Sequence, residues 1–242
     1  QIADSIGVPV LASVPTAHPS SAGDWAKLLG SYEPSPVYAW RLRKALQQLS
    51  LSGVHLTGGR DNGKGSSVSV ISLAGDRGAL ALGPQFAVFA ASLGIPTALV
   101  IGPQDDPNFT ATLRTACAEW QQSAALRGSM LRVVVTDDPN FAGYPGAMLT
   151  VVVSVVDADN PEVAATLRTT ATVIGVSAST VTAEQLARVA VSAAAEHREI
   201  AGFLVANPDP IDHTTGRIPQ LVRLPQQVAP TRVTGIVTEA KQ

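Results

Sequence analysis

Apolar runs of strand length alternate with helix-like segments along most of this chain. Such runs stand at residues 68–73, 97–101, 131–135, 149–156, 172–176 and 202–206. Helices are predicted near residues 84–92, 108–126, 161–170 and 182–199. Strands that are apolar at nearly every position are typical of a parallel sheet covered by helices on both faces. The sequence therefore predicts an α/β fold with a mostly parallel sheet.

Two further elements are predicted ahead of this alternation. Residues 7–15 form a short apolar run bounded by prolines, which predicts a strand. Residues 35–48 read as a helix, because Pro36 suits the first helical turn. The polar residues 16–23 are predicted as a loop. We interpret residues 1–242 as a single domain, in which residues 1–34 form an N-terminal juxtamembrane strand and loop.

Composition excludes several classes of protein. Apolar residues make up 45% of the 242 residues and charged residues 15%, which is typical of a globular domain. The net charge of −2 gives no bulk electrostatic reason to bind nucleic acid. Cys117 is the only cysteine, so we expect a small buried side chain and no internal disulfide. The chain begins with Gln1 rather than Met, which we interpret as a fragment of a longer protein.

A glycine-containing turn at residues 73–78 follows the strand predicted at 68–72. P-loop proteins place a glycine-rich loop here, then a lysine for the β- and γ-phosphates and a Ser/Thr hydroxyl for Mg²⁺. Gly75 and Gly78 are present, but Ala79 and Leu80 follow them, and neither side chain can bind phosphate or metal. Because proline disrupts a helix interior, Pro84 predicts that the regular helix begins there, too late for phosphate binding. The sequence thus predicts a degenerate phosphate loop.

The order of these segments resembles the cytoplasmic region of bacterial polysaccharide chain-length determinants and the tyrosine kinases (BY-kinases) fused or paired with them. Both are deviant-Walker P-loop ATPases. Residues 7–15 are similar to the family segment LG-[IV]-PVLG-x-[IV]-P, and residues 35–46 to SPxxEAFRxLRTNL. Weaker similarities follow at residues 68–91, 95–107, 151–161 and 202–207. The resemblance covers most of the chain and implies a Rossmann-like P-loop NTPase fold.

The resemblance also locates the family's functional positions in this chain. The positions of its phosphate and metal ligands hold Ala79, Leu80, Ala81, Ile101 or Gly102, and Ser154. Asn207 matches the family's base-contacting asparagine. The resemblance therefore implies no catalytic residue, no metal site and no cofactor. We expect residues 75–82 to collapse onto the strand ends near Ile101 and Ser154, with residues 79–82 filling the former phosphate hollow and leaving no nucleotide-sized cavity.

Two other segments resemble functional motifs. Residues 58–66 nearly form a Walker A motif, but a strand follows them where the motif requires a helix, so we interpret them as a surface loop. Tyr38, Arg41 and Lys44 match the family's Glu-x-x-Arg-x-x-Arg assembly motif without its acidic member. A solvated basic helix face is the alternative for these residues.

These observations favour a non-catalytic cytosolic domain of a membrane-anchored regulator of exopolysaccharide or capsule chain length or export. The resemblance implies that it acts by protein–protein interaction at the cytoplasmic face of the inner or plasma membrane. Its expected partners are other subunits of a polysaccharide synthesis or export complex and further copies of itself, but no nucleic acid. The membrane would be reached through a segment outside this chain. The alternatives are an ATPase or tyrosine kinase with an unconventional nucleotide site, and a soluble partition-type ATPase relative.

Overall fold

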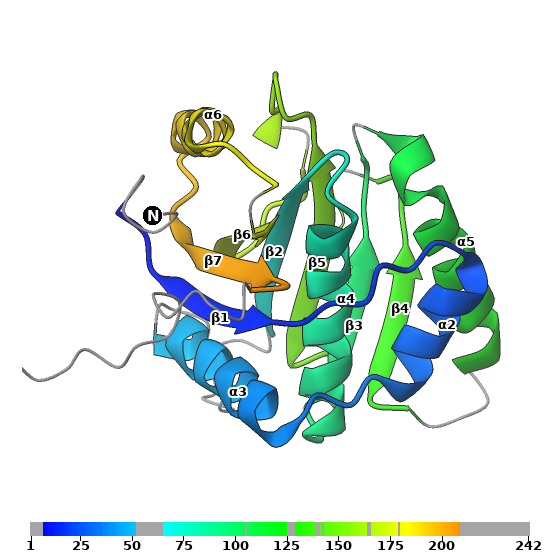
Figure 1. Cartoon of the computed structure of the whole chain (residues 1–242). Helices are drawn as coiled ribbons and strands as arrows, with labels where there is room; N and C mark the ends of the chain where they lie inside the picture. The colour runs from blue at the N-terminus through cyan, green and yellow to red at the C-terminus, as the bar shows by residue number, and fades with distance from the viewer. Residues whose placement is uncertain are drawn as a thin grey trace, which may run out of the picture.

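The computed structural model describes residues 7–51, 65–104, 106–124, 129–138, 141, 143–163, 166–178 and 180–208. Within them, seven parallel strands form one sheet in the order β1-β7-β6-β2-β5-β3-β4 (Figure 1). The strands are β1 (Val10–Val14), β2 (Ser66–Leu73), β3 (Thr97–Ile101), β4 (Leu131–Val135), β5 (Leu149–Val156), β6 (Ala171–Ser177) and β7 (Ile200–Ala206). The predicted strands and their parallel arrangement are confirmed.

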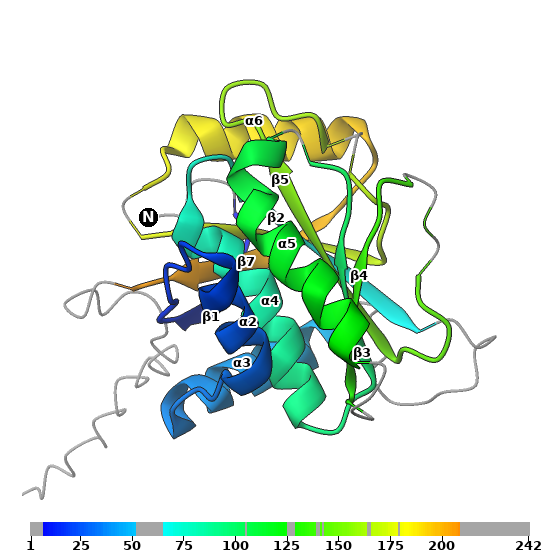
Figure 2. The same ribbon diagram turned by 90° about the vertical axis from the view of Figure 1, so that its right-hand side faces the viewer.

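Helices cover both faces of the sheet. The helices α3 (Pro36–Leu51), α4 (Arg77–Ser92) and α5 (Pro107–Ala124) lie on one face, and α6 (Ala183–Ala195) lies on the other (Figure 2). A further helix, α2 (Ala22–Ser31), packs outside α4 and α5. Successive residues of the central strand β2 point to opposite faces of the sheet: Val70 packs in the hydrophobic cluster that contains α4, and Ile71 in the cluster that contains α6. The predicted two-sided α/β architecture is confirmed.

The helix α4 begins earlier than the proline suggested. It starts at Arg77, and Asp76 is its N-cap, so the prediction of a start at Pro84 is wrong. A proline in a helix interior costs about 3 kcal/mol, but tertiary burial supplies most helix stability. Residues 78–90 are all buried, and this packing keeps Pro84 inside the helix. A Cβ on Gly83 would lie 2.8 Å from Cγ2 of Val153, so glycine allows α4 to approach the sheet closely.

The N-terminal segment contains a helix that was not predicted. We expected only a strand and loop within residues 1–34, but α2 occupies Ala22–Ser31. Its start is a capping box, in which the Ser21 hydroxyl accepts from the Asp24 amide and the Asp24 carboxylate accepts from the Ser21 amide. Trp25 and Leu28 are buried, so the helix is held by its apolar face.

The described residues of 161–170 contain no α-helix, which corrects the helix predicted there. Val163 and Leu167 are buried, but backbone carbonyl groups of this segment accept hydrogen bonds from a side chain instead of from helix amides. The Arg198 guanidinium donates to the Thr166 oxygen at 2.7 Å and to the Leu167 oxygen at 3.3 Å. A side chain from beyond α6 thereby replaces helical hydrogen bonds.

The helices predicted as α5 and α6 are confirmed. Cys117 on α5 is fully buried, and this burial raises the pKa of its thiol to about 12, as suits a packing residue. Most of the near-Walker run, residues 58–64, lies outside the described residues, as do Asp105 and the tail from residue 209. Among the described helices, none is long and apolar enough to span a bilayer.

Candidate functional site

The candidate site lies at the carboxyl end of β2, where ligands commonly bind to open parallel sheets. The chain leaves β2 through Ala74 and Gly75 and enters α4 after Asp76. Gly75 has a φ of +89°, a backbone conformation that glycine adopts without strain. The Asp76 amide closes the turn by donating to the Leu73 oxygen at 3.1 Å. The strand–turn–helix arrangement of a phosphate loop is therefore present.

The Asp76 carboxylate lies inside this turn, and only 4% of the residue is exposed. One of its oxygens accepts from the Ala79 amide at 2.9 Å and from the Ser177 hydroxyl at 2.5 Å. The other accepts from the Ser177 amide at 2.7 Å. An anion at a helix N-terminus is stabilised by the free amides and by the helix dipole. In this chain that anion is the protein's own carboxylate, and the Ala79 amide is already occupied.

Residues 16–18 cover the first turn of α4. A Cβ placed on Gly78 would collide with the Ser177 hydroxyl and lie 3.2 Å from Cε1 of His18 and 3.3 Å from Oγ1 of Thr16. Glycine at this position thus lets the chain segment after β1 lie directly against the helix start. Here the first turn of α4 meets protein atoms from β6 and from residues 16–18.

Asn207 fastens this covering segment to the end of β7. Its Oδ1 accepts from the Thr16 amide at 2.7 Å, and its Nδ2 donates to Oγ1 of Thr16 at 3.0 Å. The same Nδ2 lies 3.0 Å from Nε2 of His18. Because a backbone amide fixes the orientation of the Asn207 side chain, Nε2 of His18 acts as the acceptor. Both polar atoms of the residue matched to a base contact are thus bound within the chain.

Gly102 and Ser154, which stand at the family's metal-ligand positions, have no carboxylate side chain. Gly102 follows β3 and is packed against Leu167, because a Cβ there would lie 3.0 Å from Cδ1 of that side chain. The Gly102 oxygen accepts from Nε2 of Gln104 at 2.8 Å and from the Arg114 guanidinium at 3.1 Å. Ser154 on β5 is 1% exposed. Donors and a cation stand where a Mg²⁺ site needs carboxylate oxygens.

No metal-binding cluster is formed by the described residues. Among them, no group of three or more His, Cys, Asp or Glu side chains is placed to hold an ion. The nearby acids have structural roles. Asp106 accepts from the Phe109 amide at the start of α5, and Asp157 accepts from the amides of Asp159 and Asn160 in the turn after β5.

The side chains that follow the loop are packed. Ala79 and Ala81 have no exposed surface, and Leu80 and Leu82 are each 2% exposed. Leu82 contacts the backbone at Gly175 of β6, where a Cβ would lie 3.3 Å from its Cδ1. The start of α4 is therefore packed against the sheet and residues 16–18, and Leu80 and Leu82 belong to the same hydrophobic core as Ile101.

Comparison with known proteins agrees with this architecture. No protein-family model matches the chain, and no curated sequence is significantly similar to it. Two solved structures are similar in fold. The chimerical protein CapA2B2 has a TM-score of 0.56 at 13% identity, covering 86% of this chain and 97% of its own. The kinase domain of the Escherichia coli tyrosine kinase ETK has a TM-score of 0.51 at 12% identity, covering 90% of this chain and 98% of its own.

The chain has the fold of a bacterial tyrosine-kinase domain. This likeness bears out the Rossmann-like P-loop fold that the resemblance implied. The tyrosine-kinase fold also explains why a turn and a helix follow the central strand here even though the ligand side chains are absent. Similarity at 12–13% identity shows the fold alone, so any chemistry must follow from this chain's own residues.

Sequence reasoning missed several residues of this site. It located the loop and the absent ligands, but it assigned no role to Asp76, Ser177, Thr16, His18, Gln104 or Arg114. One signal was available for Asp76, since an aspartate directly before a helix is a favoured N-cap. The partners of its carboxylate on β6 lie 101 residues away in the chain, and no local pattern reports such a contact.

Proposed function

We propose that this chain is a catalytically inactive kinase-fold domain that acts by protein–protein interaction in a membrane-anchored regulator of polysaccharide chain length or export. The polysaccharide role and the cytoplasmic location rest on the resemblance of residues 7–15 and 35–46 to the chain-length family. The fold shared with a tyrosine-kinase domain supports the same assignment.

One observation carries the inactive part of the proposal. The Asp76 carboxylate takes the place at the start of α4 where a P-loop binds a phosphate. A second anion at this place would meet like charge and would find the Ala79 amide already bonded. Phosphoryl transfer depends on positioning and on neutralising charge, and Ala79, Gly102 and Ser154 provide no cation and no carboxylate for either.

We therefore expect nucleotide affinity to be weaker than about 1 mM, a binding free energy of less than about 4 kcal/mol. Isothermal titration calorimetry with ATP and ADP, each with Mg²⁺, measures this directly. Phosphate release from Mg²⁺-ATP should equal a blank without protein. A micromolar dissociation constant, or release above the blank, would refute the inactive assignment and favour an unconventional nucleotide site.

The surface of α3 supports the interaction part of the proposal. Val37 and Trp40 are 60% and 56% exposed, and the Lys44 ammonium lies 5.5 Å from the centroid of the Trp40 ring. Tryptophan is enriched at protein interfaces relative to the rest of the surface. By contrast, Arg41 is turned inward: it donates to the Ser13 oxygen of β1 at 3.0 Å and lies over the Tyr38 ring.

This surface can be tested in the source organism. Val37→Asp with Trp40→Asp should shift the length distribution of surface polysaccharide as far as deletion of the whole domain does, because the charges disrupt the apolar contact. The matched control is Val191→Asp on α6, which is 69% exposed and lies on the opposite side of the sheet. A double variant that keeps the wild-type distribution at normal protein levels would contradict the role of this surface.

A further inference from the structure

The loop that leads into β5 is exposed and has no charged side chain. Residues 141–150 include no Asp, Glu, Lys or Arg. Tyr144 and Pro145 are exposed at its turn, which the Ala147 amide closes by donating to the Tyr144 oxygen at 3.2 Å. Tyr144 is 39% exposed, and Met148, which follows the turn, is 38% exposed. The loop thus presents apolar rather than charged groups at the surface.

Further exposed apolar side chains lie beside this turn. Leu93 is the C-cap of α4 just before β3, and Met130 directly precedes β4. The Thr97 amide donates to the Met130 oxygen, and the Met148 amide to the Pro96 oxygen, both at 2.8 Å. Of the seven large apolar side chains that the described residues expose, four therefore lie at the edge where β3, β4 and β5 begin. An apolar patch with a polar rim marks a site of protein or membrane interaction.

Two hollows, each of about 360 Å³, flank the turn. Residues 144–147 line both of them, so the turn forms a ridge between the two. Arg132 lines one hollow and Arg168 lines the other. The described residues that line the two hollows include no Asp or Glu. An apolar ridge is therefore flanked by a cation on each side.

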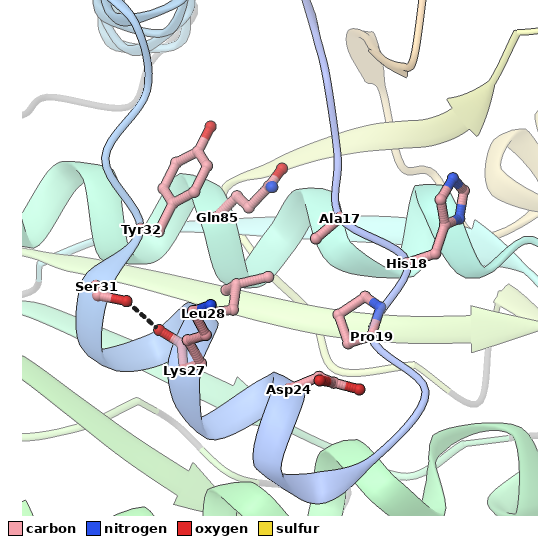
Figure 3. A pocket seen from close by; sticks show the side chains of 9 residues that line it. All are labelled: Ala17, His18, Pro19, Asp24, Lys27, Leu28, Ser31, Tyr32 and Gln85. Carbon is pink, nitrogen blue, oxygen red and sulfur yellow. Dashed lines mark hydrogen bonds between the residues drawn. The ribbon is translucent and has the colours of Figure 1, made fainter.

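Arg132 is the cation that lacks a partner in the part of the chain that the structure describes. It is exposed and forms no ion pair with those residues. The Arg168 side chain is 73% exposed, and its 3.4 Å contact with Glu196 is weakened by solvent. The hollow between α2 and α4 differs, because Lys27 and Asp24 both line it and balance its charge (Figure 3). Positive charge beside the ridge is thus left to attract an anion from outside.

We propose that this ridge docks on an anionic lipid surface. Tyr144 and Met148 enter the boundary between headgroups and acyl chains, where tyrosine is enriched in membrane proteins, and Arg132 pairs with a lipid phosphate. The choice of a lipid surface over a protein partner rests on the membrane-anchored role proposed above. In that role the ridge is a second contact, which orients the domain on the membrane.

Vesicle flotation tests this docking on the chain itself. Vesicles of equal parts phosphatidylglycerol and phosphatidylethanolamine should bind the chain at least about tenfold more tightly than vesicles of phosphatidylcholine. Added NaCl should lower the bound fraction, because salt screens the arginine charges. Equal binding to the two kinds of vesicle would overturn the proposal, and so would no binding to either, which would favour a protein partner. Failure here leaves the nucleotide and polysaccharide tests of the proposed function untouched.

Substitutions locate the contact. Met148→Glu should weaken binding to the anionic vesicles by about tenfold or more, because it brings a carboxylate to the apolar boundary. Arg132→Gln should weaken it by about fivefold, the contribution of one arginine near an anionic surface. The matched controls on α3 are Val37→Asp with Trp40→Asp for the apolar contact and Arg43→Gln for the charge. Wild-type binding by Met148→Glu, or loss of binding only in the controls, would overturn the site.

Fluorescence separates insertion of the ridge from a purely electrostatic contact. In Tyr144→Trp, lipids brominated in their acyl chains should quench the added indole when the anionic vesicles bind. The wild type is the control, because its exposed Trp40 lies on α3, away from the ridge, and should not be quenched. Equal quenching in the two proteins would show that the ridge stays outside the acyl boundary and would overturn the proposed docking.

Discussion

Asp76→Ala is expected to lower the free energy of unfolding by about 3–5 kcal/mol. Loss of an N-cap costs about 0.5–2 kcal/mol, and each buried donor left without a partner costs about 1–3 kcal/mol. The substitution removes the cap of Ala79 and leaves both the amide and the hydroxyl of Ser177 without their acceptor. For a chain of this size the Tm should fall by about 10 °C in thermal unfolding followed by circular dichroism.

Asp137→Ala is the matched control for that substitution. Asp137 also loses a charge-assisted contact, its 2.7 Å ion pair with Arg114, but its side chain is 80% exposed. Exposed ion pairs contribute at most about 1 kcal/mol, so the Tm should change little. If Asp76→Ala were no more destabilising than Asp137→Ala, the carboxylate would not be the anion that holds the start of α4.

Asp76→Asn refines the same test. A carboxylate offers two acceptor oxygens, and here they serve donors on two sides, whereas an amide offers only one oxygen. Its NH₂ group would face either the Ser177 amide or the Ala79 amide. We expect an unfolding free energy between those of the wild type and Asp76→Ala. Equality with the wild type would mean that one acceptor is enough.

Strand positions were predictable because most of the strands are apolar on both faces; β4, with the exposed Arg132, is an exception. In β5 every residue is buried, and such a run has no alternative place in a globular fold. The strand–loop–helix unit around Gly75 was predictable because a glycine-containing turn directly follows such an apolar strand. The order of the strands in the sheet came only with the structure, because it depends on crossovers that no local pattern records.

The helix errors have separate physical causes. α2 was missed because Ser20, Ser21 and Gly23 suggested a loop, although Ser21 and Asp24 stand at capping-box spacing before Trp25 and Leu28. The predicted start of α4 was too late, because the prediction considered the local cost of Pro84 and not the burial of the surrounding helix. In α4 tertiary packing outweighs a local preference, whereas in α2 the local capping signal itself favours the helix.

Asp76 shows why the occupied site could not be read from local sequence. The motif comparison considered only which ligand side chains are absent at Ala79 and Leu80. The group that caps the start of α4 is a carboxylate one residue after Gly75, bonded to a strand 101 residues further along. Gln104 and Arg114 likewise act through their contacts with Gly102.

Ala79→Lys with Leu80→Ser, which restores the missing ligand side chains of the loop, is expected to destabilise the fold without creating an ATPase. Ala79 has no exposed surface, so a lysine there must bury an unpaired ammonium or force the first turn of α4 apart. We expect a loss of more than about 3 kcal/mol, in the range of severe core substitutions. Thermal unfolding measures this loss, and Arg77→Lys, at the exposed residue before Gly78, is the control that should leave the Tm unchanged.

Hydrolysis should stay absent because side chains at positions 79 and 80 are only part of a phosphate site. Asp76 would still occupy the amide at position 79, and residues 16–18 would still cover Gly78. The strand ends at Gly102 and Ser154 would still lack a carboxylate for Mg²⁺, with the Arg114 cation beside the first of them. Phosphate release from Mg²⁺-ATP is the readout. Release above a blank without protein, in a double variant with the wild-type Tm, would mean that the phosphate site is open rather than filled.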